Sequence, residues 1–164
     1  MLAAAAARPE TLVIGVDANA AAMADSSRRA ARRKALPNAL FAVAAAERPP
    51  NVLTGLADSL TVNFPWGSLL RGVLGHDDAV LSGVAQLLGA GAMAEALVSV
   101  VPRDGVPAIP APAQLSAIYA RHGLSLLTAR PATPAEVAAS GSSWAKRLRA
   151  GRDRPVSLVR IGVR

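Results

Sequence analysis

The sequence predicts an α/β fold with a mostly parallel sheet, and three observations support this prediction. Short apolar runs alternate along the chain with segments that carry helical signals, as in strands joined by helical crossovers. At 164 residues the chain is long enough for one domain with a buried core. The last two predicted strands are joined without a long crossover, which predicts an antiparallel pair at one edge of the sheet.

The first half of the chain supplies three predicted strands. Residues 11–16 are apolar and rich in β-branched residues, as expected for a buried parallel strand that ends at Asp17. Residues 18–35 predict a helix with a basic end, which suits the helix dipole. Residues 39–43 and 58–64 predict the second and third strands.

The second half adds helices, a fourth strand and the antiparallel pair. Helices are expected to begin near Trp66 and near Asp77, whose carboxylate suits a helix N-terminus. The other predicted elements, in order, are a strand at 92–101, a proline-rich loop at 102–113, a helix at 114–121, a strand at 124–132, helical segments at 134–140 and 142–151, and a final strand at 156–163. Residues 1–164 are expected to form a single domain, in which residues 132–155 link the last two strands.

Composition narrows the class of protein. The net charge is +7 and the pI about 11.4, which points to a polyanionic partner such as nucleic acid, unless a genome rich in Arg and Ala codons explains the bias. The chain has no cysteine, which excludes disulfides, thiolate zinc sites and cysteine nucleophiles. His76 and His122 lie far apart without clustered carboxylates, so no metal site is expected. No signal peptide or membrane span is predicted, and a soluble cytoplasmic protein is expected.

Two segments after strands are candidates for a ligand site. Asp17 follows the first strand, where an acidic residue can accept hydrogen bonds from ribose hydroxyls, although it could equally be a helix N-cap. Residues 44–47 (AAAE) follow the second strand. Their small side chains would let an adenine ring approach the backbone, and the alternative is a tight turn in an alanine-rich chain.

The two tryptophans stand out because the chain has only five aromatic residues. Pro65 is expected to hold Phe64 in an extended conformation, so that Trp66 leaves the third strand at its end, unless the ring only covers the core. Trp144 lies in a strongly basic segment, residues 142–154. This combination favours a nucleic-acid surface on which arginines meet phosphates and the ring meets a base; the alternative is a solvated helix with Trp144 packed inward.

Four motifs carry a resemblance to a known family: VIGVDAN, AAAE, NFPWGSLLRGVLG and SSWAKRLRAGR. They resemble the aminoglycoside-resistance methyltransferases of the Kam and Npm type, in the same order over nearly the whole chain. That family transfers a methyl group from S-adenosylmethionine to N1 of adenosine 1408 in the 16S rRNA of the 30S subunit. The resemblance therefore implies a class I, Rossmann-like methyltransferase fold and a monomer that acts on 16S rRNA.

The resemblance also assigns roles to residues. Trp66 and Trp144 would stack on the two faces of the flipped adenine, and Arg154 would hold the RNA beside it. The residues expected to bind the cofactor are Asp17, Ala45, Ala46, Glu47, Asn63, Ser68 and Ser142. The residues expected to meet RNA phosphates are Arg28, Arg29, Arg32, Arg33, Lys34, Lys146, Arg147 and Arg152.

The chain departs from the family pattern at its start. Class I methyltransferases have a Gly-rich loop after their first strand, whereas here only an alanine-rich segment precedes Thr11. We therefore expect the family's first strand and its loop to be missing, which would leave a gap in the sheet. An RNA-binding remnant without catalysis is one alternative. An oxidoreductase fragment is another, but it lacks a G-x-G-x-x-G motif and leaves both tryptophan motifs unexplained.

Overall fold

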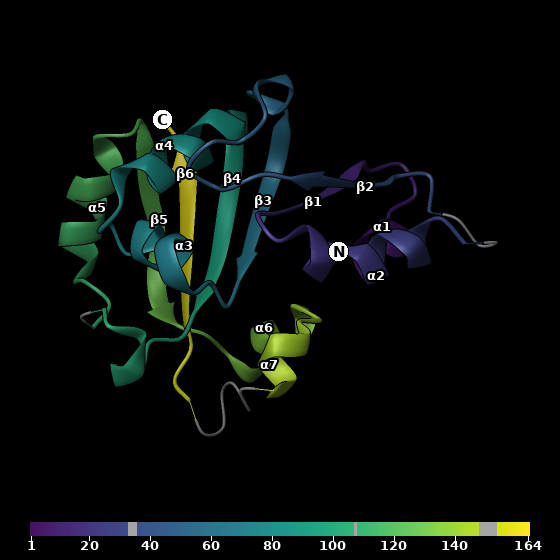
Figure 1. Cartoon of the computed structure of the whole chain (residues 1–164). Coiled ribbons are helices and arrows are strands. Elements are labelled where there is room, and N and C mark those ends of the chain that lie inside the picture. The colour runs from purple at the N-terminus through teal and green to yellow at the C-terminus, as the bar shows by residue number, and fades with distance from the viewer. Residues whose placement is uncertain (33–35, 107, 148–153) are drawn as a thin grey trace. The chain divides into compact units, whose positions relative to one another are not determined.

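The computed structural model describes residues 1–32, 36–106, 108–147 and 154–164 (Figure 1). The chain divides into two compact units, residues 1–48 (unit 1) and residues 49–164 (unit 2), and each is described by itself. Its described strands form two sheets, one of two strands and one of four. None of the described helices is long and apolar enough to cross a membrane.

Unit 1 is a small βαβ arrangement preceded by a short helix. Its elements are α1 (Leu2–Ala7), β1 (Val13–Asp17), α2 (Ala20–Ala30) and β2 (Ala39–Val43). The two strands are parallel, with Val13 opposite Ala39 and Asp17 opposite Val43. The predicted parallel pairing is therefore confirmed for these two strands.

Unit 2 contains a four-stranded sheet in the order β3-β4-β6-β5. Its elements are a 3-10 turn η1 (Asn51–Leu53), β3 (Ala57–Asn63), α3 (Gly67–Val73), α4 (Asp78–Leu87), β4 (Leu88–Val98), a 3-10 turn η2 (Pro102–Asp104), α5 (Pro112–Ala120), β5 (Leu124–Pro131), α6 (Pro134–Ala139), α7 (Ser143–Arg147) and β6 (Ser157–Val163). Strands β3 and β4 are parallel, while β6 runs antiparallel to both β4 and β5. The predicted antiparallel edge is confirmed.

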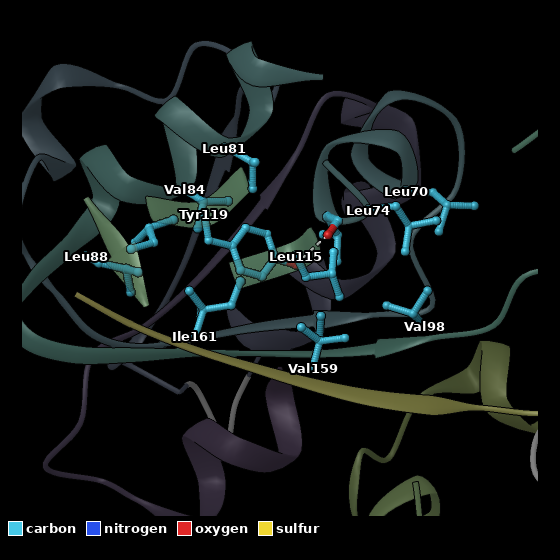
Figure 2. Close-up of a cluster of buried hydrophobic side chains, with 14 of the residues drawn as sticks. Leu70, Leu74, Leu81, Val84, Leu88, Val98, Leu115, Tyr119, Val159 and Ile161 are labelled. Atoms are coloured by element: carbon cyan, nitrogen blue, oxygen red, sulfur yellow. Dashed lines mark hydrogen bonds between the residues drawn. The ribbon is translucent and has the colours of Figure 1, made fainter. Parts of the chain in front are cut away.

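The main core of unit 2 lies between one face of this sheet and the helices α3, α4 and α5. Figure 2 shows the ring of Tyr119 among leucine and valine side chains, including Leu115 and Val84. Its hydroxyl donates a hydrogen bond to the carbonyl oxygen of Val73 (2.5 Å). Burial raises the pKa of Tyr119 above its ordinary value. The phenol is therefore a neutral donor that joins α5 to the end of α3.

A second, smaller core lies on the opposite face of the sheet. Leu97 and Leu158 are opposite each other in the β4–β6 ladder, and the neighbours Ala96 and Val159 belong to the main core. Successive side chains of a strand point to opposite faces, so Leu97 and Leu158 face away from the main core. This cluster, called the support cluster below, consists of Phe64, Leu97, Val137, Val156 and Leu158, with Ala132 and Ala145 packed against it.

Three predicted boundaries differ from those of the structure. Helix α2 ends at Ala30, and the last three residues of the predicted helix, 33–35, lie outside the described residues. Strand β4 begins at Leu88, earlier than predicted, because that end pairs with Ala57 of β3. Helix α5 begins at Pro112 inside the predicted loop, since a proline at the first helical position sacrifices no intrahelical hydrogen bond.

Candidate functional site

In unit 1, the candidate cofactor residues lie at one edge of the two-stranded sheet. Because β1 and β2 are parallel and end opposite each other, the segments that follow them leave from the same edge. The N–H of Ala44 donates to the carbonyl oxygen of Asp17 (3.1 Å), which joins the two segments directly. Asp17 therefore lies beside residues 44–47, as a ligand site shared by both segments requires.

Asp17 is exposed and is not the helix N-cap. Its Oδ1 accepts a hydrogen bond from the N–H of Asn19 (2.8 Å), whereas α2 is capped by the Asn19 side chain, which accepts from the N–H of Ala22 (3.1 Å). The alternative explanation of Asp17 as the N-cap is therefore wrong. An exposed carboxylate at the carboxyl end of a strand has the geometry to accept hydrogen bonds from a ribose.

Residues 45–47 adopt the turn that the sequence offered as the alternative to an adenine site. They form a tight turn, in which the N–H of Arg48 donates to the carbonyl oxygen of Ala45 (3.0 Å). Ala45 is exposed, and Ala46 and Glu47 are half-buried. A turn of this kind, with methyl side chains, leaves backbone accessible to a flat ring.

In unit 2, the end of β3 adopts a backbone conformation that the sequence did not predict. Phe64 has φ of 54°, in the left-handed region, and among the described residues no other non-glycine has a positive φ. The expectation that Pro65 keeps Phe64 extended is therefore wrong. Tertiary contacts explain the difference: the N–H of Phe64 donates to the carbonyl oxygen of Leu97 (2.8 Å), and its ring is 6% exposed in the support cluster. Such strain is concentrated at functional sites.

This conformation turns the chain so that Trp66 leaves the core. Trp66 is the N-cap residue of α3 and is 78% exposed, so it does not cover the core. Asn63, the last residue of β3, is exposed beside it, and Ser68 is half-buried in the first turn of α3. A large ring held in solvent at the end of a strand is available to a flat ligand.

The second tryptophan lies on the short helix α7. The Oγ of Ser142 accepts a hydrogen bond from the N–H of Trp144 (3.2 Å), so Ser142 caps this helix. Trp144 is 47% exposed, and the guanidinium carbon of Arg147 lies 5.5 Å from its ring centroid, a cation–π contact. Lys146 and Arg147 are both exposed, which leaves their charges available to phosphates.

The support cluster connects the two tryptophan segments. Phe64 lies two residues before Trp66, and Ala145, directly after Trp144, packs against the same cluster. Figure 1 shows α6 and α7 beyond the ends of β3 and β4, on the side where those strands finish. The structure thus brings both tryptophan segments to the carboxyl ends of the parallel strands β3 and β4.

Arg154 differs from the other basic candidates. Its side chain is only 13% exposed, and its Nη2 lies 3.8 Å from Oδ2 of Asp104. Its Nε is buried without a hydrogen-bond partner among the described residues. Asp104 also accepts a hydrogen bond from the N–H of Val101 (2.9 Å), which holds its carboxylate in place. Arg154 is therefore an oriented guanidinium rather than a freely exposed one.

The remaining basic candidates that the structure describes lie in unit 1, on α2 and directly after it. Arg29 and Arg32 are exposed, and Arg28 is exposed but forms an ion pair with Asp25. Three of the predicted RNA-binding residues lie outside the described residues: Arg33, Lys34 and Arg152. Among the described residues, no group of acidic, His or Cys side chains could hold a metal ion.

Sequence reasoning missed the residues that support the tryptophans. Phe64 and Val137 carry no local signal of this role, since it arises only when β3, β4, β6 and α6 meet. Thr133 and Glu136 did carry a local signal, because a Thr followed three residues later by Glu is the signature of a capping box. The two residues form such a box at the start of α6.

The fold and this site define a Rossmann-like α/β protein of the class I methyltransferase type, with exposed tryptophans at the strand ends of unit 2. The family model for NpmA, a 16S rRNA (adenine(1408)-N(1))-methyltransferase, matches residues 1–163. The chain belongs to this methyltransferase family.

Individual relatives agree with this assignment. The 16S rRNA (adenine(1408)-N(1))-methyltransferase of Streptoalloteichus tenebrarius is 38% identical over 159 residues, which cover 89% of this chain and 73% of the relative. The crystal structure of the 16S rRNA methyltransferase KamB matches with a TM-score of 0.85 and 35% identity, over 98% of this chain and 80% of that one. A tryptophan-to-alanine mutant of the Catenulisporales acidiphilia enzyme, solved with the cosubstrate SAM, matches with a TM-score of 0.84 and 31% identity, over 98% and 79%.

Proposed function

We propose that this chain transfers a methyl group from S-adenosylmethionine to N1 of adenine 1408 in 16S rRNA, within the assembled 30S subunit. Family membership supports the reaction class, and one structural observation carries the mechanism. This observation is the support cluster, which connects the segments of two exposed tryptophans at the carboxyl ends of β3 and β4. The protein would act as a cytoplasmic monomer, and methylation would give aminoglycoside resistance.

One group of residues would bind the cofactor, and another would bind the RNA. Asp17 would accept hydrogen bonds from the ribose of S-adenosylmethionine, and residues 45–47 would surround its adenine. Asn63 would lie beside the methionine part of the cofactor, and Ser68 and Ser142 would help to bind it. When bound, the cofactor supplies the electrophilic methyl group, while the chain orients the acceptor.

The tryptophans would stabilise the base outside its helix. A base that reacts at N1 must leave its stack, at a cost of a few kcal/mol. Stacking on an aromatic side chain contributes roughly 1–3 kcal/mol per base, so two rings offset this cost. Because the guanidinium of Arg147 covers one face of Trp144, the adenine would stack on the opposite face.

The chemistry needs no general base, because adenine N1 carries a free lone pair. Attack of N1 on the methyl carbon forms the N–C bond and breaks the S–C bond, and the sulfur keeps the electron pair. The positive charge passes from the sulfonium to the adenine ring. Indole faces stabilise this cation by cation–π interaction, and catalysis is then mainly alignment of N1 with the methyl group.

The basic residues would hold the RNA backbone. Lys146 and Arg147 would meet phosphates near the adenine, and Arg28, Arg29 and Arg32 would meet them more generally, together with Arg33, Lys34 and Arg152. Arg154 would hold a phosphate next to the target nucleotide. Since Asp104 already orients its guanidinium, a phosphate would share or replace that contact.

The test compares methyl transfer with cofactor binding. Trp66→Ala and Trp144→Ala should abolish methylation of 30S subunits while S-adenosylmethionine affinity, measured by calorimetry, stays within about twofold. Full methylation by either variant would contradict the stacking mechanism. Cofactor-independent, salt-sensitive RNA binding by the native chain, with no cofactor binding, would instead support an RNA-binding remnant.

A further inference from the structure

The junction of β5 and α6 carries a hydrogen-bond network that the proposed reaction does not use. The guanidinium of Arg130 donates to both carboxylate oxygens of Glu136, at 3.0 Å and 2.5 Å. The N–H and the hydroxyl of Thr133 both donate to Oε2 of the same carboxylate, at 2.8 Å and 3.0 Å. The N–H of Glu136 donates back to Thr133 Oγ1 (3.2 Å), which completes a capping box at the start of α6.

The charges at this junction are strongly coupled. Hydrogen bonding to Arg130, and next the N–H of Thr133, lowers the pKa of Glu136 to about 2. The same hydrogen bond raises the pKa of Arg130 above its ordinary value. Bidentate Arg–carboxylate geometry adds directional specificity to the attraction, so the pair fixes the angle between β5 and α6.

The helix that this network contacts is too short to be stable by itself. Helix α6 has only six residues, far fewer than an isolated helix needs to be stable in water. Val137, directly after Glu136, is buried in the support cluster with Phe64. The N–H of Val137 donates to the carbonyl oxygen of Thr133 (3.1 Å), so the cap and the buried side chain belong to the same helical turn.

We propose that the Arg130–Glu136 pair is a positioning device for the base-stacking site: it fixes α6, and through Val137 and the support cluster it sets where Trp66 and Trp144 stand. This inference rests on the proposed function, because its purpose is to align the adenine between the two rings. The proposed mechanism gives Arg130 and Glu136 no contact with the adenine or the cofactor, so the pair would act through the tryptophan segments.

The chain offers a matched control pair on the same sheet. Arg160 donates to Glu95 (2.8 Å), with side chains 43% and 38% exposed. These residues are opposite each other on β4 and β6, strands that backbone hydrogen bonds already hold in register. Loss of this pair therefore removes a comparable ion pair without releasing a helix. Glu95 also raises the pKa of Arg130, but as the smallest of its contributions.

The first experiment compares Glu136→Gln and Arg130→Met with the control Glu95→Gln, all in the full chain. The Arg130→Met variant leaves the capping box intact and so isolates the ion pair. Both pair variants should lower kcat for 30S methylation about tenfold, because small misalignments of reacting groups are costly. The KM for S-adenosylmethionine should stay unchanged, Arg130→Lys should recover part of kcat, and Glu95→Gln should stay within about twofold of the native chain.

The second experiment reports on ring position without catalysis. The chain has two tryptophans, so Trp66→Phe leaves Trp144 as a single fluorophore, and Trp144→Phe leaves Trp66. In each background, Glu136→Gln should change acrylamide quenching of the remaining tryptophan, while Glu95→Gln should not. The urea midpoint should fall further with Glu136→Gln than with Glu95→Gln, because the Glu136 carboxylate accepts more hydrogen bonds. Both kcat and quenching are therefore compared without urea, where each variant is folded.

Each outcome decides the inference. Altered quenching with a selective loss of kcat supports it. Unchanged quenching in both backgrounds overturns it, as does a loss of kcat that only follows the unfolded fraction. If the native chain transfers no methyl group, the proposed function fails, and the quenching experiment still decides whether the pair positions the rings.

Discussion

Replacing Phe64 by alanine tests whether this buried side chain anchors the segment that carries Trp66. The ring is 6% exposed and packs with four other buried residues in the support cluster. Truncation of a buried Phe to Ala costs about 3–5 kcal/mol, through lost transfer free energy and the cavity left behind. We expect about 3 kcal/mol, the lower end of this range, because a small cluster at the end of a sheet can relax into the cavity.

Glycine at the same position separates packing from backbone strain. Phe64 has φ of 54°, a conformation that costs an L-residue roughly 1–2 kcal/mol and costs glycine almost nothing. Glycine avoids this strain but loses roughly 0.5–1 kcal/mol more in backbone entropy on folding. Phe64→Gly should therefore be more stable than Phe64→Ala by about 0–1.5 kcal/mol. At Ala96, which lies within β4, the glycine variant should instead be less stable than the native alanine.

The assay is urea unfolding followed by tryptophan fluorescence. Both tryptophans lie in unit 2, so the signal reports the unit that contains Phe64. The midpoint should fall without a change in m, which tracks the surface exposed on unfolding. A loss below about 1 kcal/mol for Phe64→Ala, well under the range for a buried ring, would refute the anchoring role. A glycine variant clearly less stable than the alanine variant would refute the strain.

Three further predictions concern other parts of the chain. Asp17→Asn should weaken S-adenosylmethionine binding about tenfold to a hundredfold in calorimetry, as expected for a lost charged hydrogen bond; unchanged affinity would remove Asp17 from the site. Tyr119→Phe should destabilise unit 2 by about 1–2 kcal/mol in urea, because the buried Val73 carbonyl loses its donor, and an equal midpoint would contradict that. Hydrogen bonds lower the pKa of Glu136 to about 2. The ionised carboxylate therefore stabilises the folded chain fully above the ordinary carboxyl range, and this stabilisation is lost as the pH falls toward 2. Urea midpoints measured from pH 5 to pH 2 should fall less steeply for Glu136→Gln than for the native chain, and equal slopes would contradict this role.

Local signals in the sequence were enough to predict most elements. The apolar run of residues 39–43 gave β2 with its bounds, and Asp77 marked the start of α4, which its side chain caps. Pro65 marked the end of β3, because proline lacks the N–H that a strand ladder needs. These features depend on residues within a few positions of one another, which is why sequence alone revealed them.

Features that depend on distant residues escaped prediction. The left-handed Phe64 is held by a hydrogen bond to Leu97 and by packing against β6 and α6, which outweigh the preference of a residue before proline. The pairing of Arg154 with Asp104 joins segments far apart in the sequence. Likewise, the bidentate Arg130–Glu136 pair depends on the angle between β5 and α6, which no local pattern encodes.

Primer extension on 16S rRNA measures directly whether this chain methylates N1 of one adenine. Methylation at N1 blocks the Watson–Crick edge and stops reverse transcriptase. After 30S subunits are incubated with the native chain and S-adenosylmethionine, a stop is predicted at adenine 1408, and it should be absent with Trp66→Ala. Full read-through with the native chain, or a stop at another nucleotide, would contradict the account.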